Sequence, residues 1–417
     1  MDVNQPQALL AGLSPAQFMR RHWQKKPLLV RQAIPGFKPV MSRAALFALA
    51  ARQDVESRLI VHHDKGWRMK HGPLAPRSLP PVSKPGWTLL VQSVDGHDEA
   101  AHDLLQKFRF VPDVRLDDLM ISYASAGGGV GPHFDSYDVF LLQASGRRRW
   151  RIGRQKDLAL QQGVPLKILQ HFEPDEEFVL EAGDMLYLPP AYAHDGVAEA
   201  TVNADGKIAD CMTYSVGFRA PEASELAARL LHRLAEFSED ALEDSFESRE
   251  GEAGGGKTGG KTNAKQQVAR LYRDRQQPAT ITPAALPSGL LDFARQAVLD
   301  ALKDPLALAC ALGESMTEPK SSAYFESPAG AFTLKPSTAM PKALRLDVRS
   351  RMMYDSDHVF MNGESYRARG ADATLMRRLA DMRALSVQEL RRASAGAIAL
   401  LGDWHSAGWL HEEMVDG

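Results

Sequence analysis

Seven short apolar or alternating runs follow one another between residues 87 and 218, and they limit the possible folds more than any other feature of the chain. Gly, Pro and Asp separate these runs, and these residues favour turns. Several short strands at close spacing are typical of a β-sandwich or a β-barrel. The runs predict a mainly β domain, and they are WTLLVQSV, LMISYAS, YDVFLLQA, RRRWRIG, EEFVLE, DMLYLPP and MTYSVGF.

Elements of other kinds lie on both sides of this region. Ser14 followed by Pro15 marks the start of a short helix, and PLLVRQ predicts a strand after it. After residue 218 the pattern becomes helical, with apolar residues three and four positions apart. They form one stripe, which either covers the core of its own domain or contacts a second copy of the chain. The stripe consists of Leu226, Leu230, Leu231, Leu234 and Phe237.

The 417 residues are enough for two to three domains. The β-rich region belongs to a first part over 1–218, and a helical segment follows over 219–318. A polar low-complexity run near 249–267 predicts a flexible linker within that segment. The last part, 319–417, mixes short strands with helices and predicts a small α+β domain.

Charge and cysteine content exclude several classes of function. The net charge of -2 offers no general attraction to nucleic acid or anionic membranes, and 320–417 carries 13 Lys and Arg against 12 Asp and Glu. Direct nucleic-acid binding is therefore not expected. The two cysteines, Cys211 and Cys310, lack the spacing of a metal site and fit a reducing cytoplasm. We expect neither secretion nor a membrane span, because no signal-like start or long apolar run occurs.

The run GGKTGGKT at 255–262 matches the phosphate-loop pattern G-x-x-x-x-G-K-[ST]. That loop needs a buried strand before it and a helix after it, so that backbone N–H groups converge on phosphate. The preceding residues, EDSFESREGEA, contain no apolar strand, so we predict no nucleotide site here. No function is predicted for the apparent insertions near 201–210 and 249–267.

The segment HFDSYD carries the residues that indicate chemistry. Side chains two apart share one face of a β-strand, so a strand here would place His133, Asp135 and Tyr137 together. An imidazole and a carboxylate supply two adjacent metal ligands. A second histidine would complete the two-histidine, one-carboxylate triad of iron(II) oxygenases. His194 is the candidate, because early and late strands of a double-stranded β-helix lie side by side.

We therefore predict that His133, Asp135 and His194 bind a metal and act in catalysis on a jelly-roll, cupin-like fold. Until the resemblance given below is considered, an exposed strand without a metal remains the alternative explanation of the H-x-D pattern. Oxygen activation at iron(II) needs additional electrons, which 2-oxoglutarate usually supplies. Its distal carboxylate needs a fixed cation, and alternation along RRRWRIG directs Arg148 inward with Trp150. Arg148 can bind that carboxylate through charge-assisted hydrogen bonds.

Four segments together resemble the bacterial cytoplasmic branch of the Jumonji C-domain ribosomal oxygenases, which hydroxylate an arginine of large-subunit ribosomal protein sixteen. The resemblance implies a catalytic double-stranded β-helix, a helical dimerisation segment and a C-terminal winged-helix-like domain. It implies the same iron ligands and the same role for Arg148. The family commonly adds a hydroxyl to the 2-oxoglutarate carboxylate, and SYASAGGG leaves Ser122 and Ser125 both open. The segments are GGGVGPHFDSYDVFLLQASGRRRWRIG, GDMLYLPPAYAHDG, YSVGFRAP and TEPK.

An arginine substrate also needs its guanidinium to be held in place. A carboxylate and an aromatic face can do this, by ion pairing and by cation–π contact. The candidates are Asp118, Met120, Tyr137 and Ser215, and each also has a structural explanation. For Tyr137 the functional explanation is favoured, because it has the same strand parity as His133.

The expected protein is a cytoplasmic, homodimeric hydroxylase that uses iron(II), 2-oxoglutarate and O2. Its substrate would be the β-carbon of an arginine in a large-subunit ribosomal protein. One alternative is an oxygenase of the same fold with another target, a ribosomal histidine or a tRNA base. The other is a cupin-type, ligand-sensing regulator that binds DNA through its C-terminal domain.

Overall fold

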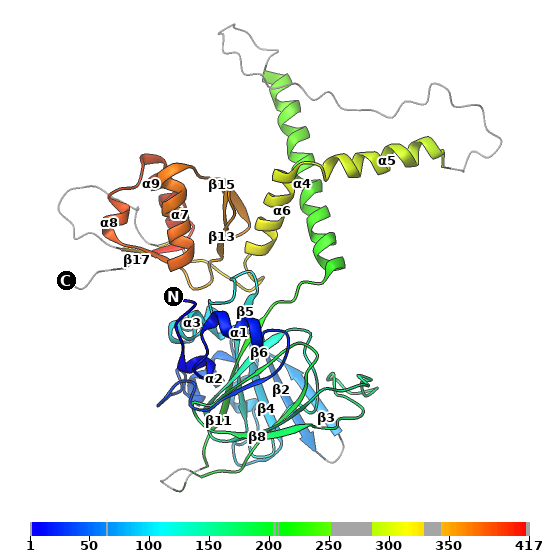
Figure 1. The fold of residues 1–417 in the computed structure, drawn as a ribbon, viewed down its shortest axis with the longest axis vertical. Helices are drawn as coiled ribbons and strands as arrows, with labels where there is room; N and C mark the ends of the chain where they lie inside the picture. The colour runs from blue at the N-terminus through cyan, green and yellow to red at the C-terminus, as the bar shows by residue number, and fades with distance from the viewer. Residues whose placement is uncertain are drawn as a thin grey trace. The chain divides into compact units, whose positions relative to one another are not determined.

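The computed structural model describes residues 2–63, 66–202, 206, 208–251, 286–328 and 343–413 (Figure 1). The chain divides into two compact units. One comprises Met1–Ala220, Pro319–Ser350 and Asp381–Gly417, and the other comprises Pro221–Glu318 and Arg351–Ala380. The phosphate-loop match at 255–262 and most of the predicted linker lie outside the described residues. So does the run QQVARLYRDR, for which the sequence also predicts a helix.

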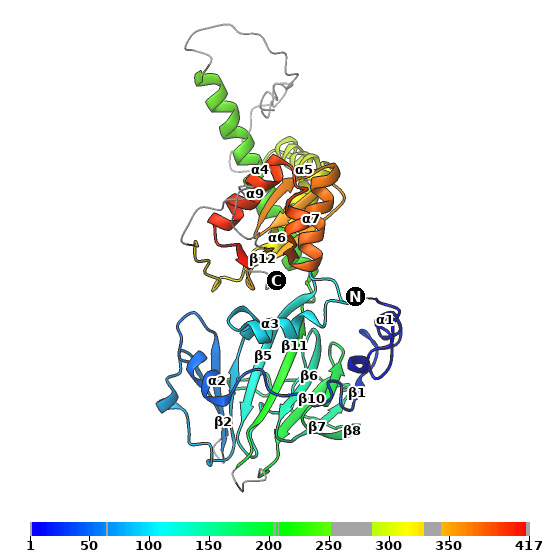
Figure 2. The same ribbon diagram turned by 90° about the vertical axis from the view of Figure 1, so that its left-hand side faces the viewer.

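The β-rich part of the first unit, which lies within residues 1–220, contains an antiparallel sheet of eight strands, in the order β1-β9-β6-β11-β5-β4-β2-β3. Figure 2 shows β5, β11 and β6 side by side at its centre. A smaller sheet has the order β10-β7-β8. The strands are β1 (Leu28–Val30), β2 (Ser57–His63), β3 (Gly66–His71), β4 (Trp87–Val91), β5 (Leu116–Ala124), β6 (Asp138–Ser145), β7 (Arg148–Gly153), β8 (Glu176–Leu180), β9 (Met185–Leu188), β10 (Ala193–Ala198) and β11 (Cys211–Phe218).

The two faces of the large sheet bury different cores. On one face, alternate residues of the central strands pack with apolar residues of the N-terminal helices, such as Phe18 and Leu46. The helices near this region are η1 (Ala8–Leu10), α1 (Pro15–Arg21), α2 (Arg43–Leu49), η2 (Pro76–Ser78), η3 (Val94–Gly96) and α3 (Glu99–Gln106). On the other face, Leu141 and Leu186 form one cluster with Trp150 of the small sheet. The two sheets therefore face each other, and the space between them holds the candidate site.

The predicted fold class is confirmed: the β-rich part of the first unit is a mainly β, cupin-like sandwich of two sheets. Each of the seven predicted runs contains a strand. The helix predicted at Ser14 is also present, and its capping box joins the Ser14 and Gln17 side chains to each other's backbone N–H groups. Strand β10 was not predicted as a separate element, although His194 lies on it.

The second unit begins with helices. Helix α4 packs against α6, and Leu234 in the predicted stripe is buried while Leu231 remains 50% exposed. Contact of this stripe with a second copy of the chain stays a prediction. The unit contains α4 (Ala223–Gly251), α5 (Ser288–Ala301), α6 (Pro305–Thr317), β13 (Met352–Tyr354), β14 (His358–Met361) and β15 (Glu364–Arg367), followed by most of α7 (Gly370–Met382).

The remaining C-terminal elements belong to the first unit. Strand β12 (Ala343–Leu346) pairs with β16 (Ala384–Leu385) and β17 (Leu410–Glu413), and α8 (Val387–Leu390) and α9 (Ala395–Ser406) lie between the last two strands in the sequence. The predicted boundaries at 218 and 318 stay predictions, since the division in space splits the last hundred residues between both units. No helix in the described parts of the chain is long and apolar enough to span a membrane.

Candidate active site

His133 and His194 lie opposite each other at one end of the small sheet. Their backbones form an isolated antiparallel bridge, in which the His133 N–H donates to the His194 carbonyl at 3.0 Å and the reverse bond is 2.8 Å. The carbonyl of Asp135 accepts from Ala191 N–H at 2.8 Å. These bonds place the three predicted ligands together although two of them are 61 residues apart in the sequence.

The expectation of a strand through His133, Asp135 and Tyr137 is wrong. Strand β6 begins only at Asp138, and the residues before it are irregular apart from the bridge at His133. The bridge to His194, rather than strand alternation, therefore sets the direction of His133. Asp138 points away from the site and is fully buried, accepting a 2.6 Å hydrogen bond from the Tyr187 hydroxyl.

The ligand atoms of His133, Asp135 and His194 all lie within 4.8 Å of one another. In the described part of the chain, this is the one group of three or more potential His, Cys, Asp or Glu ligands close enough to hold an ion. The Nε2 atom of His194 is 3.8 Å from Oδ2 of Asp135. Two imidazole nitrogens and one carboxylate oxygen suit a divalent transition metal such as iron(II).

Hydrogen bonds to the backbone fix the tautomers of both histidines. Nδ1 of His133 donates to the Gly131 carbonyl at 2.9 Å, and Nδ1 of His194 donates to the Tyr192 carbonyl at 3.0 Å. Nε2 of each ring is then the unprotonated nitrogen that a metal requires. Burial, and then the neighbouring His133, lower the pKa of His194 to about 4, which favours the neutral form of its imidazole.

Arg148 lies on the inner face of β7, as its alternation with Trp150 predicted. Its side chain is only 4% exposed, whereas Arg149 points outward and forms ion pairs with Glu177 and Glu199. Nε and Nη2 of Arg148 are buried without a hydrogen-bond partner among the residues that the structure describes. Because a buried unpaired cation is costly, this guanidinium fits an anionic ligand that enters the space between the sheets.

Trp150 connects Arg148 to the histidine pair. The Arg148 guanidinium carbon lies 5.7 Å from the centre of the Trp150 ring, whose own centre is 5.8 Å from that of His194. Strand β10 opposes Trp150 with Gly196, where a Cβ would lie only 2.6 Å from the indole. A glycine is therefore required at this position, since any side chain would displace Trp150.

The two candidate serines differ in the hydrogen bonds that their hydroxyls form. The Ser125 hydroxyl accepts from Trp87 N–H at 3.1 Å and donates to the Trp87 carbonyl at 3.3 Å. Ser122 makes one bond, a donation to the Thr213 carbonyl at 3.3 Å. Ser122 also lies on the inner face of β5, because Ile121 and Tyr123 face the helix-side core. The hydrogen bonds and the strand face therefore favour Ser122 over Ser125 as the hydroxyl predicted to bind the 2-oxoglutarate carboxylate together with Arg148.

Three predicted substrate residues lie on the inner face of β5 and β11. In the register of these strands, Asp118 is opposite Gly217 and Met120 is opposite Ser215. A Cβ on Gly217 would lie 3.7 Å from both Oδ1 of Asp118 and Cε2 of Tyr137, so the carboxylate and the ring border the same small space. Desolvation, and then the charges of Asp135 and Asp118, raise the pKa of Tyr137 above its ordinary value.

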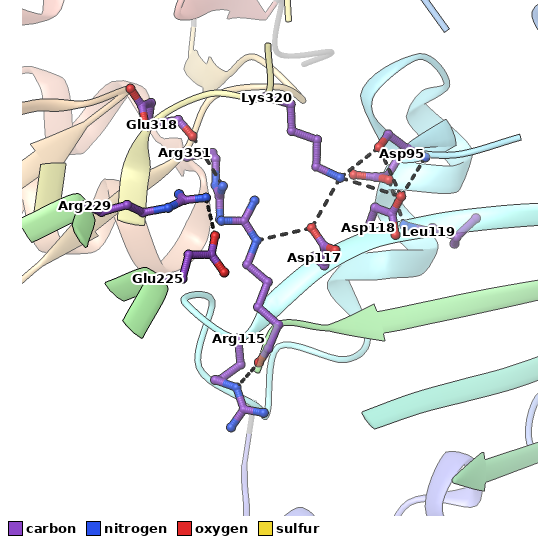
Figure 3. A network of polar contacts seen from close by, with 12 residues as sticks. Asp95, Arg115, Asp117, Asp118, Leu119, Glu225, Arg229, Glu318, Lys320 and Arg351 are labelled. Atoms are coloured by element: carbon purple, nitrogen blue, oxygen red, sulfur yellow. Dashed lines mark hydrogen bonds and ion pairs between the residues drawn. The ribbon is translucent and has the colours of Figure 1, made fainter. Parts of the chain in front are cut away.

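A lysine that the sequence left without a role also reaches this region (Figure 3). Lys320 belongs to the TEPK segment, and its Nζ lies 3.6 Å from Oδ2 of Asp118 and 3.5 Å from Oδ1 of Asp117. It donates to the Ser93 hydroxyl at 2.8 Å. No local pattern could have predicted these contacts, because more than 200 residues separate Lys320 from Ser93 and Asp118.

Two protein-family models match this chain, and one of them covers the region that carries the candidate site. A family model described as JmjC domain matches residues 103–226, and one described as ROXA-like winged helix matches residues 300–411. The ribosomal protein uL16 3-hydroxylase of Escherichia coli K12 is 42% identical over 212 residues, which are 50% of this chain and 53% of that protein. The match thus spans about half the length of this curated relative.

Solved structures extend the likeness over nearly the whole chain. The crystal structure of the Escherichia coli ribosomal oxygenase YcfD has a TM-score of 0.71 and 30% identity, and the match covers 95% of this chain and 98% of that one. A structure of YcfD in complex with cobalt and 2-oxoglutarate has a TM-score of 0.73 and 28% identity, over 96% and 99% of the two chains. The chain therefore belongs to the bacterial Jumonji C-domain ribosomal oxygenases.

Proposed function

We propose that the protein is an iron(II)- and 2-oxoglutarate-dependent hydroxylase of a ribosomal protein. One observation carries this proposal: three potential metal ligands converge, and Trp150 lies between them and a buried arginine whose Nε and Nη2 have no hydrogen-bond partner in the described structure. The first group fits a metal and the second fits a carboxylate. An enzyme that uses 2-oxoglutarate needs both in one cavity.

His133, Asp135 and His194 would hold the iron, and Arg148 would bind the distal carboxylate of 2-oxoglutarate with Ser122 beside it. When bound, iron(II) and 2-oxoglutarate allow O2 to hydroxylate a C–H bond, with release of succinate and carbon dioxide. The chain keeps both imidazoles in the tautomer that leaves Nε2 free. Trp150 and the apolar cluster around it, Val139, Leu141, Ile152 and Leu186, exclude water from the space behind the ligands.

The proposed substrate is an arginine of a ribosomal protein, oxidised at its β-carbon. The name of the Escherichia coli relative supports a ribosomal target. In this chain, Oδ1 of Asp118 and the ring of Tyr137 border the space at Gly217, which suits a guanidinium that needs a carboxylate and an aromatic face. Met120 and Ser215 would line the path between that space and the metal ligands. With a ribosomal substrate, the proposed reaction would occur in the cytoplasm.

Replacing Asp118 with asparagine tests the arginine assignment. We expect Asp118→Asn to raise the KM for an arginine peptide about tenfold or more, because it removes one charge-assisted hydrogen bond. Peptide-independent turnover of 2-oxoglutarate should stay close to the wild-type rate, since the metal ligands and Arg148 are unchanged. The measurements are peptide hydroxylation by mass spectrometry and succinate formation.

A matched peptide with citrulline in place of arginine serves as the control. Citrulline keeps the shape of the side chain but not its charge, so wild-type protein should prefer arginine and Asp118→Asn should lose most of that preference. If the variant discriminated between the two peptides as strongly as wild type does, Asp118 would not be the partner of the guanidinium. Preferential oxidation of a histidine peptide by the wild-type protein would favour the alternative target.

A further inference from the structure

We propose that Lys320 is a positioning residue for the substrate site: with Ser93 it holds one oxygen of Asp118, so that the other oxygen faces the substrate. This inference rests on the proposed function, because it assigns a purpose to the orientation of Asp118. Lys320 lies outside the β-sandwich and would act only through Asp118, without touching the substrate, the metal ligands or Arg148.

The contacts of Asp118 are divided unequally between its two oxygens. Oδ2 accepts from the Ser93 backbone N–H at 2.8 Å and from the Ser93 hydroxyl at 3.1 Å, and it lies 3.6 Å from Nζ of Lys320. Oδ1 has no hydrogen bond within the described part of the chain and lies beside Gly217 and Tyr137. The carboxylate is thus anchored through one oxygen and presents the other to the inner face of the sheet.

A cation is needed at this point because several carboxylates are crowded together. Asp117 and Asp118 are neighbours in the sequence. The carboxylate of Asp95 lies close to them, because it accepts a 2.8 Å hydrogen bond from the backbone N–H of the next residue, Leu119. Desolvation, and then the charge of Asp118, raise the pKa of Asp95 to about 6, while Lys320 lowers it. Arg219 also pairs with Asp117, at 3.2 Å, but Lys320 is the cation that lies against Asp118 in the described structure. Without Lys320 the charges of Asp95 and Asp118 would repel each other, and Asp118 could turn away from Asp95 and lose its fixed orientation.

The neighbourhood leaves open space beside Lys320 and Asp118. A cavity of about 290 Å³ adjoins Lys320 and is lined mainly by polar residues, among them Gln92, His97 and Ser322. A guanidinium is larger than an ammonium, and the cavity provides room for it. An arginine at position 320 should therefore keep the positive charge beside Asp118 without disturbing the sheet.

The segment that carries Lys320 has a second attachment to the same part of the catalytic region. Nε of Arg349 donates to the Gly96 carbonyl at 3.0 Å, at the end of the turn that contains Asp95. Arg349 forms no bond to Asp118. It therefore attaches the segment to the same turn without touching the proposed substrate residue, which makes it a matched control for Lys320.

The test compares Lys320→Met, Lys320→Arg and Arg349→Met in the full chain loaded with iron(II). We expect Lys320→Met to raise the KM for the arginine peptide about tenfold while kcat and peptide-independent succinate formation stay near wild type. Lys320→Arg should restore the KM, and Arg349→Met should leave it unchanged. Ser93→Ala retains the lysine and should also raise the KM for the arginine peptide. This variant replaces Lys320→Met in the test if Lys320→Met does not fold.

Three results would overturn the inference. The first is a wild-type KM in both Lys320→Met and Ser93→Ala. The second is an equal rise in KM for Lys320→Met and Arg349→Met, which would show that Lys320 only attaches its own segment to the β-sandwich and does not orient Asp118. The third is failure of Lys320→Arg to restore the KM while it restores thermal stability. Wild-type protein that forms succinate but never oxidises the arginine peptide would contradict the proposed function itself, and this inference with it.

Discussion

His133→Ala should abolish succinate formation and metal binding together. The variant removes one of the three proposed protein ligands, and the two that remain would hold an ion far less tightly. His133 also contributes the backbone bridge to His194, but alanine keeps that bridge because its N–H and carbonyl are unchanged. We therefore expect a folded protein that retains neither iron nor 2-oxoglutarate turnover. Metal content by mass spectrometry and succinate by chromatography measure the two effects separately.

His71→Ala is the matched control for this experiment. His71 is an exposed histidine at the end of β3 and lies outside the group of potential metal ligands. Its replacement should change neither metal content nor turnover. Undiminished turnover by His133→Ala would show that the triad has been assigned to the wrong residues.

Arg148→Met should raise the KM for 2-oxoglutarate by about tenfold to a hundredfold, because a charge-assisted hydrogen bond contributes roughly 1.5–3 kcal/mol. Methionine fills most of the space beside Trp150, so the variant removes the charge with little loss of packing. Metal binding should be unaffected, since Arg148 contacts none of the three ligands in the described structure. The KM is measured from succinate formation at increasing 2-oxoglutarate concentration.

The adjacent Arg149 provides the control. Arg149→Met removes an exposed arginine from the same strand, together with its ion pairs to Glu177 and Glu199. Exposed pairs of this kind contribute little to stability, and the KM for 2-oxoglutarate should stay at the wild-type value. An equal rise in both variants would mean that general strand damage, rather than the inward guanidinium, explains the effect of Arg148→Met.

Local patterns were sufficient for much of the fold. The seven apolar runs contain strands because alternation and turn residues are properties of a few neighbouring residues. The helix at Ser14 followed from a capping signal within the first turn. The inward direction of Arg148 followed from alternation, because β7 is a regular strand over its whole length.

Patterns failed where long-range contacts decide the geometry. The residues around His133 resemble a strand in sequence, but their conformation depends on the bridge to His194, which only the folded chain provides. The contacts of Lys320 could not be predicted from local patterns either, because its partners Ser93 and Asp118 lie far away in the sequence. The segment SYASAGGG also left Ser122 and Ser125 both open, and the hydrogen bonds of Ser125 to Trp87 distinguish them.

Intact-mass analysis of ribosomal proteins tests the central claim most directly. Cells that contain this gene would be compared with cells that lack it, and with cells that carry the His133→Ala variant in its place. The account predicts that one large-subunit protein is heavier by one oxygen atom only in cells with the active chain, and that fragmentation places this oxygen on an arginine. Identical masses in all three strains, or an added oxygen on a residue other than arginine, would contradict it.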